Sequence, residues 1–252
     1  MNSILIASTL FVALVAAVPI GRKARKHLPE DHLCAESRDA IKLAMGLVAT
    51  MTALLLGLLV SSAKGTYDNQ RSQIIVMASK LGYLGRVIRA YGPETDEARA
   101  EILAAAVDGM RRMWPDEPGV RGELAASAPS GDGAYAAIHA LQPRDELQRG
   151  LKEQALTLTV DIGQIRMLML TESVPSIPKL LLLTVGCWLV VIFLFFGILA
   201  PPNATTALSL AAAGLSVAGA LFLILEFDQP LGGMIRISSE PLIQAIQLLE
   251  KT

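Results

Sequence analysis

Charge, cysteine and aromatic side chains are scarce in this chain. Only 18% of its 252 residues are charged and 5% are aromatic, whereas 52% are hydrophobic. The 22 Lys and Arg residues nearly balance the 23 Asp and Glu residues, so the formal net charge is −1. A chain without an excess of either charge lacks the electrostatic signature of proteins that bind nucleic acids or strongly acidic ligands. We therefore expect no nucleic-acid partner.

The two cysteines do not predict a disulfide. Cys34 lies in a polar loop, whereas Cys187 lies inside a long apolar run, so the two thiols belong to different environments. Two such residues make no disulfide framework, and the sequence leaves the redox compartment open.

Catalytic and cofactor motifs are missing as well. The sequence has no glycine-rich phosphate loop, no nucleophile elbow and no paired-cysteine metal motif. His27, His32 and Cys34 gather in the first loop, but their spacing matches none of the usual tetrahedral zinc patterns. The simpler interpretation is a solvated loop. We expect no enzyme activity, no cofactor and no metal.

Long hydrophobic runs are what the chain has in plenty. Four blocks lack any ionised side chain: residues 3–20, 43–63, 180–200 and 204–225. Each is close to the ~20 residues that a helix needs to cross ~30 Å of hydrocarbon. A helix that is apolar on every face must be surrounded by apolar material. The sequence therefore predicts an all-α integral membrane protein with four transmembrane helices.

The first block resembles a secretory signal peptide in its position alone. Residues 1–3 supply no basic segment ahead of the apolar run. The nearest basic residues, Arg22, Lys23, Arg25 and Lys26, follow the run instead. Because a signal peptide carries its positive charge before the apolar region, we interpret the block as a retained span and not as a cleaved leader.

The polar middle of the chain shows helical periodicity. After the second block, apolar residues recur at spacings of three and four, which defines the first stripe: Ile74, Met77, Leu81, Leu84, Ile88 and Tyr91. Such a stripe predicts a narrow contact with one partner helix. A second stripe follows Pro143: Leu147, Leu151, Ala155, Leu158, Ile162, Ile165 and Met169. We expect an antiparallel helical hairpin domain inserted between spans two and three, with a compact bundle on the membrane surface as the alternative.

The expected domain boundaries follow from these patterns. Residues 1–63 hold transmembrane helices one and two with a basic connecting loop, and residues 64–179 hold the hairpin domain. A flexible tip is expected near 116–133, where glycine, proline and serine gather. Residues 180–225 hold transmembrane helices three and four. Residues 226–252 form an interfacial tail whose short amphipathic helix, with Leu242, Ile243, Ile246 and Leu249 on one face, suits the membrane surface or a neighbouring subunit.

The second span carries one small side chain per helical turn. These residues, here called the small-residue face, are Ala49, Ala53, Gly57, Ser61 and Gly65. Small residues let helices approach closely in lipid, so one interpretation is tight packing against another span. The other interpretation is that this face lines a central pathway, where small side chains leave room and hydroxyl groups are available. The sequence leaves both open.

Two carboxylates follow the fourth span. Glu226 and Asp228 lie where that span ends. Acidic residues at a membrane boundary can mark an ion or partner site. More often such residues are interfacial groups in water or partners for the backbone of the next turn. Two carboxylates alone do not complete a metal shell.

The charge pattern gives no clear membrane orientation. The first loop holds six basic residues, whereas three follow the second span within ~20 residues: Lys64, Arg71 and Lys80. This bias favours a cytoplasmic first loop and an external helical middle. Arg166, Lys179, Arg236 and Lys251 favour the opposite orientation. The side on which residues 64–179 lie is left unresolved.

Several short patterns resemble a known family. They run from the first loop to the exit of the fourth span: Leu28-Pro29-Glu30, Glu36-Ser37-Arg38-Asp39, Gly57-Leu58-Leu59, Ser176-Ile177-Pro178, Phe196-Gly197, Pro201-Pro202-Asn203-Ala204 and Glu226-Phe227-Asp228-Gln229-Pro230. Together they resemble the bestrophin-like family of uncharacterised bacterial multi-pass membrane proteins. The resemblance covers nearly the whole chain and is weakest over residues 99–143.

This resemblance carries functional implications. It implies a homo-oligomeric anion channel in the bacterial plasma membrane, passing chloride or another small anion. The second span would surround the axis, and the helical middle would lie in the cytosol. The alternative function is a non-conducting membrane scaffold or sensor that uses its helical domain to bind a partner.

Overall fold

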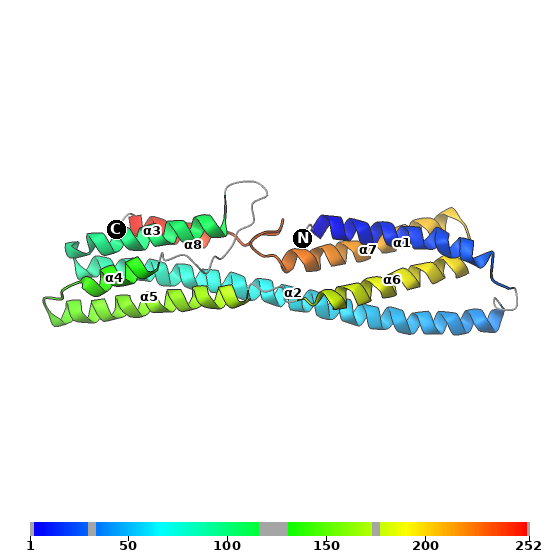
Figure 1. Ribbon diagram of the computed structural model, residues 1–252, viewed down its shortest axis with the longest axis horizontal. Coiled ribbons are helices and arrows are strands. Elements are labelled where there is room, and N and C mark those ends of the chain that lie inside the picture. The colour runs from blue at the N-terminus through cyan, green and yellow to red at the C-terminus, as the bar shows by residue number, and fades with distance from the viewer. Residues whose placement is uncertain (1–2, 30–33, 116–130, 173–176, 251–252) are drawn as a thin grey trace. The chain divides into compact units, whose positions relative to one another are not determined.

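The computed structural model describes residues 3–29, 34–115, 131–172 and 177–250 (Figure 1). Every regular element in these ranges is a helix, which confirms the all-α prediction. In chain order the elements are α1 (Ser3–Arg25), α2 (Ala35–Tyr91), the 3-10 helix η2 (Pro93–Thr95), α3 (Asp96–Met113), α4 (Asp132–Ala140), α5 (Glu146–Glu172), α6 (Lys179–Leu199), α7 (Ala204–Phe227) and α8 (Glu240–Glu250). Of the expected flexible tip, residues 116–130 lie outside the described ranges.

Four of these helices are long and apolar enough to cross a membrane: α1, α2, α6 and α7. They contain the four apolar blocks that the sequence indicates, except Ala200, which follows the last residue of α6. Together with the run of ~20 apolar residues in each, this confirms an integral membrane protein with four candidate spans. The second candidate span is one part of α2, a helix of 57 residues that continues without a break beyond the apolar block.

Helix ends follow local chemistry. Asn203 begins α7, because its side-chain oxygen accepts a hydrogen bond of 2.8 Å from the backbone N–H of Thr206. Helix α2 ends before Gly92, which adopts φ 128°, a backbone conformation that favours glycine. Pro93 then supplies no N–H to prolong α2 and suits the first position of η2.

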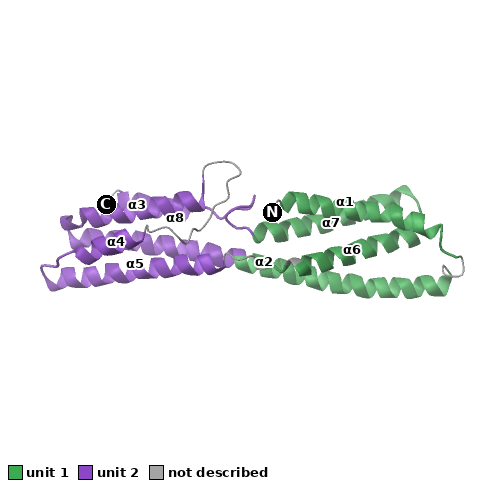
Figure 2. Ribbon diagram, viewed as in Figure 1, with its two compact units in different colours: residues 1–66, 176–228 green, residues 67–175, 229–252 purple. Residues whose placement is uncertain are grey.

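The chain divides into two compact units, each described here by itself (Figure 2). Unit 1 consists of residues 1–66 and 176–228, and unit 2 of residues 67–175 and 229–252. Unit 1 therefore contains the four apolar blocks, whereas unit 2 contains the polar middle together with the C-terminal segment. Helix α2 contributes one part to each unit.

In unit 1, α1 packs against α6 and α7. Two glycines permit the closest approach of α1 and α6. A Cβ atom at Gly21 would lie 2.1 Å from the carbonyl oxygen of Leu194, and one at Gly197 would lie 2.2 Å from that of Val18. Since both neighbours are backbone atoms, no larger side chain fits at either position. Small residues permit close helix contacts in lipid. In this chain, α1 and α6 make such a contact with each other.

In unit 2, the first stripe forms the centre of the core. All six of its residues are buried, from Ile74 at 0% exposed to Leu81 at 6%. The second stripe, on α5, is buried at Ala155, Leu158 and Met169, but Leu147 is 71% exposed. The periodicity of three and four therefore identified the core face of α2 fully and that of α5 except at its first residue.

Polar contacts show that α2 and α5 run antiparallel within unit 2. Near the start of unit 2, Asn69 and Gln73 both donate to Oε2 of Glu172, over 2.9 and 2.7 Å. Farther along α2, Lys80 pairs with Asp161 at 2.5 Å. At the end of α2, the backbone oxygen of Tyr91 accepts a 3.0 Å hydrogen bond from the Gln148 side chain. As the residue numbers on α2 rise, the residue numbers of their partners on α5 fall, which is the pattern of antiparallel helices.

The amphipathic face of α8 lies in the core of unit 2. Leu242, Ile246 and Leu249 are all buried there, with at most 6% exposed. Arg99 of α3 donates to the backbone oxygens of Leu249 and Glu250 over 3.0 and 2.9 Å, which fixes the end of α8. This differs from the expected position on a membrane or a neighbouring subunit. The apolar face that suggested a membrane contact is used instead inside the chain.

Candidate functional site

The membrane-crossing part of α2 is the least covered of the four candidate spans. In its most apolar 18-residue window, 11% of the residues are buried inside the chain. The corresponding share is 28% in α1, 33% in α6 and 28% in α7. Most of the surface of this part of α2 is therefore left to lipid or to other chains.

The small-residue face lies on this uncovered side. Ala49, Ala53, Gly57, Ser61 and Gly65 are all exposed in the single chain. A Cβ atom at Gly57 or at Gly65 would meet no atom within 4 Å. Within the described residues, the face therefore contacts no other span of its own chain at these glycines.

The opposite side of the same helix holds it to unit 1. Thr52, Leu59 and Ala63 are 2%, 3% and 0% exposed, and the latter two belong to the apolar core of this unit. The buried hydroxyl of Thr52 donates to the backbone oxygen of Val48 over 2.7 Å, so it needs no partner from another helix. One side of α2 is thus fixed, and this fixes where the small-residue face points.

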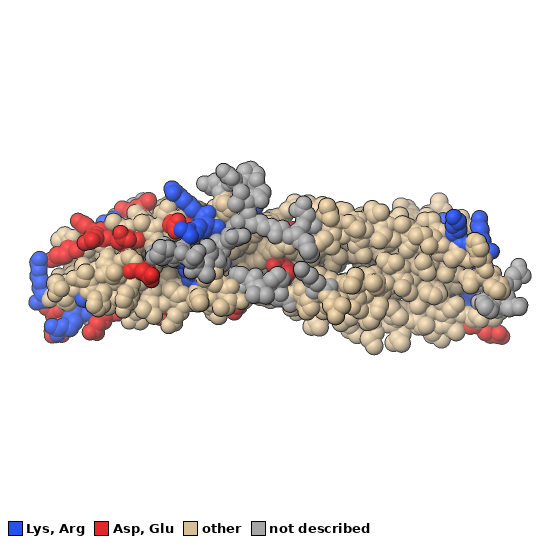
Figure 3. All heavy atoms as spheres, in the orientation of Figure 1, with Lys and Arg blue, Asp and Glu red and all other residues tan. Residues whose placement is uncertain are grey.

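The face of unit 1 that Figure 3 shows is uncharged over most of its length. Figure 3 shows a broad area without Lys, Arg, Asp or Glu over the unit 1 helices, with charged residues gathered at their loop end. In the sequence, Lys23 and Arg25 lie in the last turn of α1, and Asp39 pairs with Lys42 near the start of α2. This distribution is the one that a hydrocarbon layer requires, because ionised side chains are costly inside it.

The acidic pair at the exit of α7 is divided by burial. Glu226 is 3% exposed, whereas Asp228 is half-buried. Each of the two residues has an interaction partner within the chain. The backbone N–H of Asp228 donates to Ile224 over 3.1 Å, which ends the helix. The interpretation as interfacial groups in water does not suit Glu226. No group of three His, Cys, Asp or Glu residues that could hold a metal occurs in the described ranges.

Cys34 precedes α2 outside the membrane-crossing segments. Its Sγ lies 3.1 Å from Oγ of Ser37, and hydrogen bonding with the side chain and backbone of Ser37 lowers the pKa of this exposed thiol below its ordinary value. Of the two histidines considered with it as zinc ligands, His27 is described and exposed, whereas His32 lies outside the described residues.

The comparison with protein families decides the family of the chain. The bestrophin-like domain matches residues 9–242, which is most of the sequence and includes the larger part of the first apolar block and all of the other three. The chain belongs to the bestrophin-like family. This confirms the resemblance drawn from the short sequence patterns. None of the curated proteins matches the chain.

Solved structures share the fold of this bestrophin-like protein. A variant of a bacterial bestrophin homologue from Klebsiella pneumoniae aligns with a TM-score of 0.70 at 14% identity, over 97% of this chain and 98% of that one. A second crystal structure of the Klebsiella homologue gives 0.69 at 14% identity, over 96% and 97%. A structure described as a membrane protein variant gives 0.71 at 14% identity, over 97% of both chains. The fold is therefore shared along the whole chain.

Proposed function

We propose that this protein assembles with copies of itself into an anion channel of the bacterial plasma membrane, with the small-residue face of α2 toward the axis. Chloride or another small anion is the proposed permeant species. The proposal draws on the bestrophin-like family and on the resemblance to bestrophin channels, in which the second span surrounds the pore.

The observation that carries this proposal is the incomplete cover of α2. A span that leaves both small side chains and large ones such as Leu54 and Leu58 exposed has two kinds of free surface. Large apolar side chains suit lipid or a neighbouring copy, whereas small ones leave space beside the helix. A ring of copies with α2 innermost uses both surfaces.

The hydroxyl groups of α2 contribute to the pathway unequally. The hydroxyl of Thr50 donates to the backbone oxygen of Gly46 over 2.9 Å, so its proton is committed to its own helix. Ser61 lies on the small-residue face itself, where its hydroxyl can turn toward an anion. Because residues 43–63 contain no aromatic side chain, the narrowest part of the proposed pathway is formed by aliphatic and small residues.

Current through planar bilayers tests this proposal. Purified protein should carry anion-selective current, and Gly57→Leu should abolish it by filling the pathway. Gly219→Leu is the matched control, because Gly219 is an exposed glycine of α7 whose Cβ would also meet no atom within 4 Å. It should conduct normally. A well-folded oligomer that carries no current overturns the proposal.

The mass of the Gly57→Leu particle separates the two interpretations of the face. Lost current with an unchanged particle mass supports a face that lines the pathway. A reduced mass supports a face that packs one copy on another, since a leucine at a close helix contact separates the helices.

The scaffold or sensor function has less support. It was motivated by the two apolar stripes and by the polar tip of the helical domain. The first stripe is buried inside unit 2, and residues 116–130 of the tip lie outside the described ranges. We also propose that the protein is not an enzyme, because the sequence carries no recognisable catalytic motif.

The membrane orientation is proposed from the relationship to bestrophins, which favours a cytosolic position for the helical middle, residues 64–179. Labelling of Cys34 from either side of the membrane tests this orientation.

A further inference from the structure

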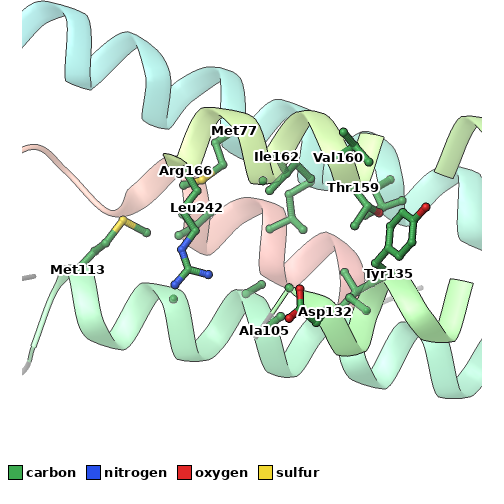
Figure 4. Close-up of a pocket in the computed structure, with 18 of the residues that line it drawn as sticks. Met77, Ala105, Met113, Asp132, Tyr135, Thr159, Val160, Ile162, Arg166 and Leu242 are labelled. Atoms are coloured by element: carbon green, nitrogen blue, oxygen red, sulfur yellow. The ribbon is translucent and has the colours of Figure 1, made fainter. Parts of the chain in front are cut away.

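Unit 2 contains a cavity that the proposed channel function does not use. It has a volume of about 300 Å³ and is lined by parts of α2, α3, α4, α5 and α8 (Figure 4). Its walls are mainly apolar and include Leu84 of α2, Ile102 of α3, Ile162 of α5 and Leu242 of α8. A volume near the lower end of the ~300–1,000 Å³ range of ligand pockets suits a small molecule.

The cavity exists because two facing helices present small residues to it. Ala105 and Gly109 line it from α3, and Gly163 lines it from α5. A Cβ atom at either glycine would meet no atom within 4 Å. Larger residues at these positions would have filled the space from inside the chain, so the space is a property of the sequence.

Two guanidinium groups line the cavity. Arg112 of α3 and Arg166 of α5 are both lining residues, and the side chain of Arg166 extends from α5 toward α3 (Figure 4). Arg112 pairs with Asp108 at 2.9 Å, and Arg166 also has an interaction within the chain. Asp132 is the acidic residue among the described lining residues. A guanidinium group has five N–H donors, so one ion pair does not use all the donors that it presents beside the apolar walls.

We propose that this cavity binds a small amphipathic carboxylate, with its apolar part between α2, α3 and α8 and its carboxylate at Arg112 and Arg166. Guanidinium groups are the preferred protein partners of carboxylates because they form two parallel hydrogen bonds. At ~30 Å³ for each non-hydrogen atom, the volume holds about ten such atoms. The proposal is independent of whether the protein conducts.

Octanoate matches this size and chemistry and serves as the probe. Its binding is measured by equilibrium dialysis with the full-length protein in lipid nanodiscs, after subtraction of binding to empty nanodiscs. Saturable binding of octanoate is expected. Octylammonium, which has a chain of equal length and the opposite charge, should show none, and octanol should bind at least tenfold more weakly than octanoate.

Two pairs of variants on α5 locate the site. Gly163→Leu fills the cavity and should remove saturable binding, whereas Gly150→Leu places the same side chain outside it, at another exposed glycine with no atom within 4 Å of its Cβ. Arg166→Gln should weaken binding about tenfold or more. Arg149→Gln, which changes an exposed arginine outside the lining, should bind like the wild type.

Four results would overturn the proposal. Octanoate without saturable binding removes the site, and equal losses in Gly163→Leu and Gly150→Leu place binding elsewhere. Equal binding of octanol and octanoate removes the role of the arginines. A changed particle mass in Gly163→Leu, with normal mass in Gly150→Leu, makes the cavity a contact between copies of the chain. Arg112→Gln provides a second test of the carboxylate if Arg166→Gln does not fold.

Discussion

The two parts of helix α2 are buried in different ways. In unit 2 its apolar stripe is covered by the chain's own helices, and Ile74 and Leu84 are 0% and 2% exposed. In unit 1 the same helix leaves Leu54 and Leu58 at 68% and 62% exposed. Unit 2 thus completes its core within one chain, whereas unit 1 leaves apolar surface that lipid or further copies must cover. A single helix can therefore serve as core in one unit and as an unfinished interface in the other.

The largest effect is expected at the contact of α1 with α6 in unit 1. Gly197→Leu places a side chain against the backbone of Val18, where even a Cβ has no room. It should cost about 3 kcal/mol or more and should greatly reduce the yield of monodisperse protein from detergent. Gly219→Leu on α7, at an open position, should give a normal yield. Equal yields from both variants would contradict the close approach.

The next effect compares the core of unit 2 with the surface of unit 1. Leu84→Ala removes a side chain that is 2% exposed and should lower the free energy of unfolding by about 2–5 kcal/mol. Leu215→Ala, at a leucine of α7 that is 63% exposed, should cost less than about 0.5 kcal/mol. Denaturant titration of the full chain in micelles measures both. Equal losses would mean that the surface of α7 is as tightly packed as the core of unit 2.

A smaller effect is expected at a polar atom inside the core of unit 2. The hydroxyl of Tyr91 is buried without a hydrogen-bond partner among the described residues, and burial raises the pKa of this phenol. Tyr91→Phe removes the unsatisfied group and keeps the ring, so stability should be unchanged or rise by up to about 1 kcal/mol. The same titration checks it. A loss of more than about 1 kcal/mol would show that the hydroxyl has a partner after all.

Replacing either cysteine by serine should have the smallest effect on stability, and it concerns unit 1 alone. What differs between the two variants is their labelling. Both are exposed in the single chain, but Cys187 belongs to a candidate span and Cys34 does not. A membrane-impermeant maleimide should label the Cys187→Ser variant and spare the Cys34→Ser variant in sealed vesicles that present the first loop. Equal labelling would place α6 in water.

The pH dependence of this labelling follows from the lowered pKa of Cys34. Thiolate is the reactive form, and it accumulates at lower pH when the pKa is below its usual value. The labelling rate should therefore rise with pH through a midpoint below the ordinary one, and Ser37→Ala should move this midpoint upward. An unchanged midpoint would show that Ser37 does not act on the thiol.

Features set by local sequence could be predicted, and features set by pairing of distant helices could not. The four apolar blocks and the first stripe follow from run length and periodicity. The second stripe was predicted to be buried along its whole length, and this was wrong at Leu147. Its neighbour Gln148 contacts Tyr91, the last residue of α2. Leu147 therefore lies where α2 ends and has no α2 residue left to pack on. Periodicity alone does not show this.

The contact of Gly21 with α6 and the cavity of unit 2 depend on the pairing of distant helices, so the sequence did not predict them. Gly197 belonged to a recognisable pattern, but nothing in the sequence pairs it with the end of α1. The glycines and alanines that line the cavity look like ordinary helix residues until α3 and α5 face each other. The position of the small-residue face was indicated by its spacing, whereas its exposure depended on which side of α2 the chain covers.

The mass of the detergent-solubilised particle, corrected for bound detergent, tests the central claim most directly. The claim is that α2 leaves its small-residue face for further copies of the chain. It predicts a particle of several times the 26.8 kDa chain mass, as expected for a ring around an axis. A particle of 26.8 kDa, monodisperse and folded, would contradict it, because a single chain has no axis for α2 to surround.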